Sequence, residues 1–123
     1  MSMDDPDDGA TGDVDWKVVR KLTGGDEGLL DELIALFPQE SASHLDSIRK
    51  AIADGDGESL TRAAHTLKSS AALFGARELA ECAREMETAG GTADAVEAAA
   101  RLEALEEATA RVVATLEKRQ GAQ

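Results

Sequence analysis

Residues 60–76, LTRAAHTLKSSAALFGA, contain the side chains of this chain that are best suited to chemistry. A histidine, His65, is followed three residues later by a lysine, Lys68. A neutral imidazole is a competent nucleophile toward phosphorus, and its ordinary pKa of about 6.5 leaves it largely neutral at cellular pH. Because residues three apart are neighbours on a helix, the ammonium of Lys68 would lie near the oxygens of a phosphoryl group on the ring. The spacing therefore indicates a phosphoryl acceptor with an electrostatic helper.

The apolar pattern of this segment predicts where His65 points. Apolar residues recur in alternating steps of four and three, as in an amphipathic helix. They are Leu60, Ala64, Leu67, Ala71 and Phe74. At about 100° per residue, His65 points roughly 140° away from the centre of that stripe, into solvent.

The exposed face around His65 is expected to dock a partner protein. Ser69 and Ala72 are small and leave room for another active site to reach the ring, and Leu73 would add an apolar contact. Thr61 and Arg62 are predicted to lie on the same face. Taken singly, each of these features has an ordinary structural explanation, since most surface histidines on helices have no role.

Composition limits the classes of function. The chain has 123 residues, enough for one domain with a single core, and its formal net charge is −12. Six aspartates and no Lys or Arg lie in the first 15 residues, so residues 1–12 are expected to be a disordered acidic leader. Residues 119–123, after the last predicted helix, are expected to be a disordered tail. Nucleic-acid binding needs clustered Lys and Arg, which argues against such a partner.

No membrane association is expected, because no apolar run approaches the roughly 20 residues that cross a bilayer. The N-terminus has neither the basic nor the apolar region of an export signal. A single cysteine, Cys82, suits a reducing compartment. These features together predict a cytoplasmic protein.

The chain is predicted to be all-α, because Ala, Leu and Glu dominate and β-branched alternation is nearly absent. Turn residues divide it into five helices, expected over residues 15–22, 26–53, 57–74, 77–89 and 93–118. Pro38 should kink the second helix, and Asp56 and Thr92 are expected to be N-caps. Four amphipathic helices with short connections favour an up-down-up-down antiparallel four-helix bundle over residues 13–118, with a short additional N-terminal helix across one end.

The sequence shows no means of using ATP. Its paired glycines, at 24–25 and 90–91, mark turns rather than a phosphate-binding loop. His44 and His65 are not joined by the spacing of a metal site, so neither a metal nor another cofactor is expected. These observations predict a phosphoryl carrier that is not itself an enzyme.

The residues around His65 resemble the motif of the histidine-containing phosphotransfer (HPt) domain family. The resemblance rests on HTLKSS at residues 65–70, Gly75-Ala76, Leu79 and residues 82–87, and upstream on Asp15-Trp16, Gly24-Gly25-Asp26, Phe37 and Asp56. It covers nearly all of residues 13–118. Two residues depart from the family pattern: glycine is usual where Ser69 stands, and Pro38 is uncommon.

The resemblance implies a four-helix bundle whose histidine accepts a phosphoryl group from the aspartyl phosphate of a receiver domain, or from a kinase, and passes it to another receiver. Carried over by position, His65 would be the phosphorylation site, and Lys68 would stabilise the phosphoryl group. The partners would be receiver domains of response regulators or a hybrid sensor kinase, which supply the Mg²⁺, and the chain would be a monomer.

Two alternatives remain at the level of the sequence. The phosphoacceptor domain of a histidine kinase also uses a helical histidine, but usually has an acidic residue directly after it and a proline a few residues on. Here Thr66 follows His65, and no proline occurs after Pro38. The other alternative is a helical adaptor that binds a partner without taking phosphate.

Overall fold

The computed structural model describes residues 13–121, and within them every regular element is an α-helix. The helices are α1 (Trp16–Thr23), α2 (Glu27–Asp54), α3 (Gly57–Leu73), α4 (Arg77–Gly91) and α5 (Ala95–Gly121). The all-α prediction is thus confirmed for the described part of the chain. The acidic leader expected at residues 1–12 lies outside the described residues.

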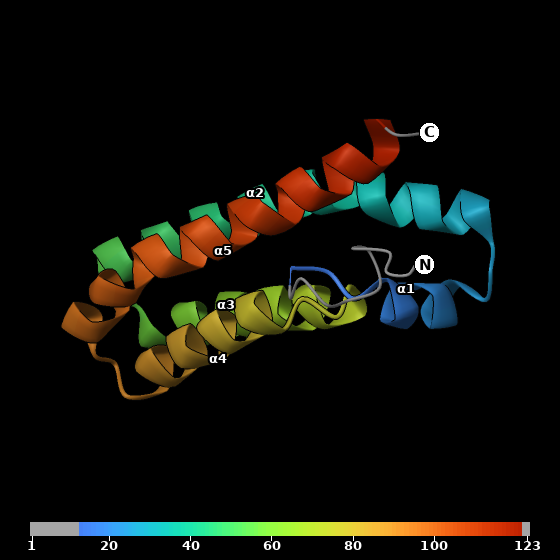
Figure 1. The fold of residues 1–123 in the computed structure, drawn as a ribbon. Coiled ribbons are helices and arrows are strands. Elements are labelled where there is room, and N and C mark those ends of the chain that lie inside the picture. Colours follow the sequence, from blue (N-terminus) through green and yellow to red (C-terminus); the bar gives the residue numbers. More distant parts are fainter. Residues whose placement is uncertain (1–12, 122–123) are drawn as a thin grey trace.

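The helices form two layers around one core. Figure 1 shows α2 and α5 side by side in one layer and α3 and α4 in the other, with α1 at one end. Each of these four long helices packs against two of the others: α3 against α2 and α4, and α5 against α4 and α2. The short α1 contacts α2 and α3. His65 therefore belongs to a helix that is held on two sides and open on another.

Aspartate side chains determine where the first three helices begin. Asp15, Asp26 and Asp56 each accept a hydrogen bond from a backbone N–H in the first turn of the following helix, at 3.0–3.1 Å. Such caps satisfy donors that have no partner within the helix. The prediction of Asp56 as an N-cap is confirmed.

The prediction of Thr92 as the N-cap of the last helix is wrong. Its hydroxyl donates to the carbonyl of Ala89 at 3.1 Å and so closes α4 instead. Asp94 is the cap of α5, since its carboxylate accepts from the backbone N–H of Glu97 at 2.9 Å. The reason is that Ala93 has a positive φ of 56°, which breaks the helical path before α5 begins at Ala95.

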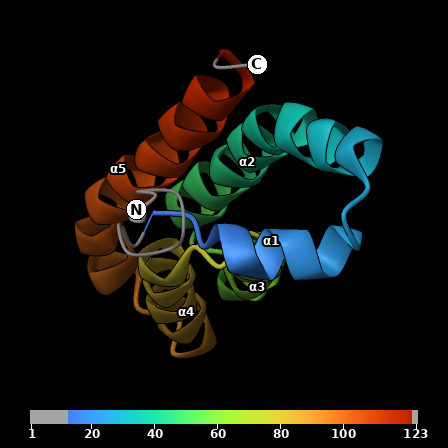
Figure 2. The ribbon, with the colours of Figure 1, turned by 45° about the vertical axis from the view of Figure 1, so that its right-hand side comes forward.

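Pro38 lies inside one continuous helix, α2. Proline cannot donate to the carbonyl of Ile34, so the helix can bend at this point. Figure 2 shows the N-terminal part of α2 turning toward α1. Beside the proline, Phe37 meets Phe74 edge to face, with ring centroids 5.2 Å apart, and so packs α2 against the end of α3.

The C-terminal helix is longer than the sequence predicts. The predicted end of the last helix at residue 118 is wrong, because α5 continues to Gly121. Residues 122–123 of the expected tail lie outside the described residues. The guanidinium of Arg119 lies over the ring of Trp16 in α1, 4.9 Å from its centroid. This cation–π contact joins the two ends of the described chain, and no local pattern of the sequence predicts it.

Candidate functional site

The buried stripe of α3 is the one that its sequence predicts. Leu60, Ala64, Leu67, Ala71 and Phe74 are all buried. The His65 side chain, on the opposite side of the helix, is 59% exposed. The predicted orientation of the imidazole is therefore confirmed.

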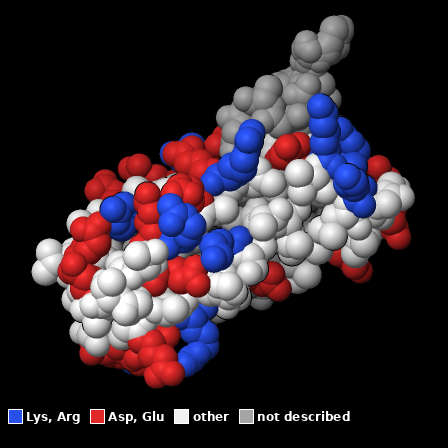
Figure 3. Space-filling view, turned by 90° about the horizontal axis from the view of Figure 1, so that it is seen from below, with Lys and Arg blue, Asp and Glu red and all other residues white. Residues whose placement is uncertain are grey.

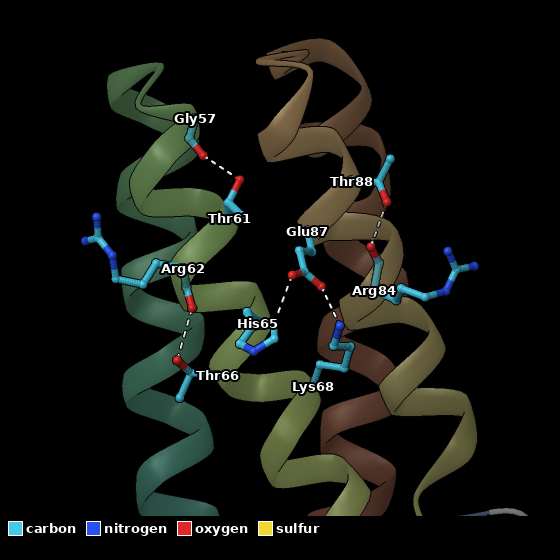
Figure 4. A network of polar contacts seen from close by, with 9 residues as sticks. All are labelled: Gly57, Thr61, Arg62, His65, Thr66, Lys68, Arg84, Glu87 and Thr88. Atoms are coloured by element: carbon cyan, nitrogen blue, oxygen red, sulfur yellow. Dashed lines mark hydrogen bonds and ion pairs between the residues drawn. The ribbon is translucent and has the colours of Figure 1, made fainter.

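A glutamate on the neighbouring helix connects His65 with Lys68. Oε2 of Glu87 lies 2.9 Å from Nδ1 of His65, and Oε1 of the same carboxylate accepts from Nζ of Lys68 at 2.7 Å. Figure 4 shows His65 and Lys68 on α3 facing Glu87 on α4. The Lys68 and Glu87 side chains are only 32% and 24% exposed, so part of this network is shielded from water.

The charge of Glu87 determines which nitrogen of His65 is free. The hydrogen bond from Lys68, helped by that from His65, holds the pKa of Glu87 below its ordinary value, although burial acts in the other direction. The carboxylate is therefore ionised at neutral pH and can only accept hydrogen bonds. Nδ1 must then carry the ring proton of neutral His65, which leaves the lone pair on Nε2.

A close approach of α3 and α4 makes this network possible. A Cβ atom on Gly90 would lie 2.6 Å from Oγ1 of Thr61 and 2.8 Å from its backbone nitrogen, closer than real side chains come. Gly90 follows Glu87 by about one turn, and Thr61 precedes His65 by about one turn. Glycine at this position lets the two helices meet where His65 and Lys68 pair with Glu87.

The structure corrects the predicted exposure of one docking residue, Thr61. It is half-buried against α4 rather than fully exposed, and its hydroxyl donates to the carbonyl of Gly57 at 2.9 Å. The pattern of α3 could not show this, because it does not reveal where α4 lies. Thr61 still lines an open hollow beside His65 and Glu87.

The other four predicted docking residues lie at the surface. Arg62, Ser69 and Ala72 are exposed, and Leu73 is 42% exposed rather than turned inward. Figure 3, which views the side of the molecule where α3 and α4 lie, shows uncharged surface across the middle of this face. A partner could therefore approach His65 without displacing bulky side chains, and the docking role of these residues stays a prediction.

Comparison with known proteins identifies the family. A family model, the Hpt domain, matches residues 32–118, which is more than half of the chain. The chain belongs to the Hpt domain family. Its structure is similar to the crystal structure of histidine-containing phosphotransfer protein B (HptB) from Pseudomonas aeruginosa PAO1, with a TM-score of 0.83 and 25% sequence identity, over 89% of this chain and 96% of that chain. No curated protein matches the sequence significantly.

Membership in the Hpt family indicates the general role of this chain. Hpt proteins are phosphorelay carriers rather than catalysts, and this Hpt domain accordingly acts in phosphorelay signal transduction. Among residues 13–121, no helix is long and apolar enough to cross a membrane. The same residues contain no group of three or more His, Cys, Asp and Glu side chains that could hold a metal ion.

Glu87 is the residue in contact with His65 and Lys68 to which the sequence assigned no role. It lies within the family motif, yet its own helix offers only a weak signal: it follows Met86 at the edge of the buried stripe of α4. A polar residue at that edge faces a neighbouring helix. Which helix that is, and which side chain it meets, depends on the tertiary packing.

Proposed function

We propose that His65 is the residue that carries the phosphoryl group, taking it from the aspartyl phosphate of a receiver domain and passing it to the aspartate of another. The observation that carries this proposal is the 2.9 Å contact between Nδ1 of His65 and the carboxylate of Glu87. It orients an exposed imidazole with its unprotonated nitrogen available for attack. Lys68 is the residue that stabilises the phosphoryl oxygens, and Glu87 is a positioning residue.

The transfer step follows from these contacts. The lone pair on Nε2 of His65 attacks phosphorus, an N–P bond forms, and the P–O bond to the aspartate breaks with its electron pair on the leaving carboxylate. The proton on Nδ1 stays in place, so the ring becomes cationic next to the Glu87 carboxylate. Lys68, one turn along α3, can turn its ammonium from Glu87 toward the phosphoryl oxygens. The reverse step delivers the group to the next receiver.

The rest of the proposal concerns partners and cofactors. The partners are receiver domains of response regulators or of a hybrid sensor kinase, and each supplies the Mg²⁺ for its own aspartyl phosphate. They dock on Arg62, Ser69, Ala72 and Leu73, and Thr61 lies at the edge of this surface. The chain works as a cytoplasmic monomer, has no catalytic activity of its own, and needs neither a nucleic acid nor a membrane.

The alternating up-and-down course of the four long helices is also part of the proposal. Connections of only two or three residues separate α2 from α3, α3 from α4, and α4 from α5. Such short connections favour antiparallel neighbours. In this arrangement α3 and α4 run side by side along their length, which is what the pairing of His65 with Glu87 requires.

A labelling experiment tests the proposal. A receiver domain phosphorylated with acetyl phosphate in the presence of Mg²⁺ is incubated with the full chain, and the phosphate on the chain is tested for stability. We expect a base-stable, acid-labile label that His65→Gln abolishes, with an unchanged circular dichroism spectrum. His44→Gln is the matched control and should keep the label. Labelling that persists in His65→Gln would refute the assignment, and the absence of label from every receiver would favour an adaptor.

A further inference from the structure

The first helix carries positive charges that have no carboxylate partner among residues 13–121. Within residues 13–121, none of Lys17, Arg20 and Lys21 forms an ion pair, and all three side chains are exposed. Seven other cations do form such pairs, namely Arg49, Lys50, Arg62, Lys68, Arg84, Arg101 and Arg111. On a chain with a net charge of −12, this concentration of unpaired cations on one short helix needs an explanation.

The same helix exposes apolar surface. Val18 is 38% and Leu22 is 49% exposed, so both apolar side chains could contact a binding partner. Figure 3 shows Lys and Arg side chains at the end of the face where α1 lies, beside the uncharged surface described above. We call Lys17, Val18, Arg20, Lys21 and Leu22 the α1 strip.

The α1 strip is held firmly against the end of the histidine-bearing helix. The backbone N–H of Asp15 donates to the carbonyl of Phe74 at 2.8 Å, and Trp16 and Val19 are buried beneath it. A Cβ atom on Gly75, which has a positive φ of 59°, would lie only 3.2 Å from Cβ of Val18. The strip is thus a continuation of the surface of α3 rather than a separate, loosely attached segment.

The strip lies within reach of a partner that is seated on His65. Phe74, the C-cap of α3, lies nine positions after His65, and at 1.5 Å per residue this is about 14 Å along the helix axis. A stable interface covers roughly 800 Å² of each partner, which corresponds to a disc with a radius of about 16 Å. A domain centred near His65 would therefore reach the start of α1, where Lys17 and Val18 lie, and Lys21 is about one turn further along that helix.

We propose that the α1 strip is part of the surface that docks the receiver domain, and that its unpaired cations select receivers with an acidic rim around the phosphorylated aspartate. Such a donor is anionic by its chemistry, because it holds a phosphoryl group and the carboxylates that bind Mg²⁺. Lys17, Arg20 and Lys21 attract this charge and speed the encounter, while Val18 and Leu22 provide apolar contact. The inference rests on the proposed function and extends it to the choice of partner.

Single-turnover transfer kinetics test the inference with the full chain: KM is the receiver concentration that gives half of the maximal transfer rate, and kcat is that maximal first-order rate. The probe is a receiver domain, phosphorylated with acetyl phosphate, that labels the wild-type chain. We expect Lys21→Glu to raise the KM for this receiver about threefold, and Lys17→Glu/Lys21→Glu about tenfold, with kcat changed by less than about twofold. The differences should shrink at 1 M salt, where the Debye length falls to about 3 Å. Leu22→Asn should raise KM at both salt concentrations, because it removes an apolar contact.

Lys118→Glu is the matched control. Lys118 is exposed, forms no ion pair within the described residues, and lies on α5 in the layer opposite α3 and α4, so its reversal makes the same change in net charge elsewhere (Figure 1). Its KM should stay within about twofold of wild type. An unchanged or lowered KM in the α1 double variant, or a rise in Lys118→Glu equal to that in Lys21→Glu, would overturn the inference while wild-type labelling still supports His65. A wild-type chain that no receiver labels would refute the proposed function itself and the inference with it.

Discussion

Replacing Glu87 with glutamine removes one negative charge from the His65 site and keeps the shape of the side chain. In the wild-type chain, the ionised carboxylate can only accept, so it keeps the proton of neutral His65 on Nδ1. A glutamine amide can accept through its oxygen or donate through its nitrogen. In Glu87→Gln, the ring can therefore adopt either tautomer, and part of the population has its proton on the attacking nitrogen.

The magnitude follows from the type of hydrogen bond that is lost. A hydrogen bond to a charged group contributes about 1.5–3 kcal/mol, against about 0.5–1.5 kcal/mol for a neutral one. The ring gains positive charge as the N–P bond forms, so this difference affects the transition state more than the ground state. A loss of about 1.4 kcal/mol corresponds to a tenfold decrease in rate. We expect the first-order rate of transfer to His65 to fall about tenfold in Glu87→Gln.

Two measurements check this prediction. The ¹⁵N chemical shifts of the ring of His65 report its tautomer, and rapid-quench transfer from a saturating phosphorylated receiver reports the rate of the chemical step. Glu81→Gln is the matched control, since it makes the same substitution on α4 at a carboxylate that pairs with Arg84. A wild-type ring protonated mainly on Nε2, or equal transfer rates in Glu87→Gln and Glu81→Gln, would refute the reasoning.

Further predictions concern the docking face, the electrostatics and the helix contact. Ser69→Trp should block transfer sterically with the fold intact, and an unchanged transfer rate would contradict the docking face. Lys68→Met should raise the pKa of Glu87, followed by NMR titration of its carboxyl carbon, because Lys68 is the main cause of the lowered value. In the wild type, the ion pair of Lys68 and Glu87 stabilises the folded chain above about pH 4.5, and this stabilisation is lost as the pH falls through the lowered pKa of Glu87. Gly90→Ala should cost about 1–3 kcal/mol in thermal unfolding, because its Cβ would overlap the α3 backbone, whereas Gly91→Ala has open space and should cost much less.

Local patterns predicted the helices and the orientation of His65. Apolar spacing determines which face of a helix is buried, and a capping aspartate such as Asp56 determines where a helix begins. Both depend only on residues within a few positions of each other. For the same reason, His65 and Lys68 could be placed one turn apart on α3 before the position of any other helix was known.

Contacts between helices were beyond the reach of such patterns. The half-burial of Thr61 depends on how closely α4 approaches α3, and the contact of Arg119 with Trp16 depends on how α5 and α1 are placed. The start of α5 was misplaced because a positive φ at Ala93, which the residue type does not suggest, interrupts the helix.

The sequence by itself determined that an imidazole stands in water with an ammonium one turn away, because helical periodicity is a property of a single segment. Only the tertiary structure decided that Glu87, 22 residues further along the chain, lies between the two side chains. That position depends on the distance and rotation between α3 and α4, which the close contact at Gly90 permits. Periodicity shows which face of a helix is buried, but not which side chains of another helix it meets.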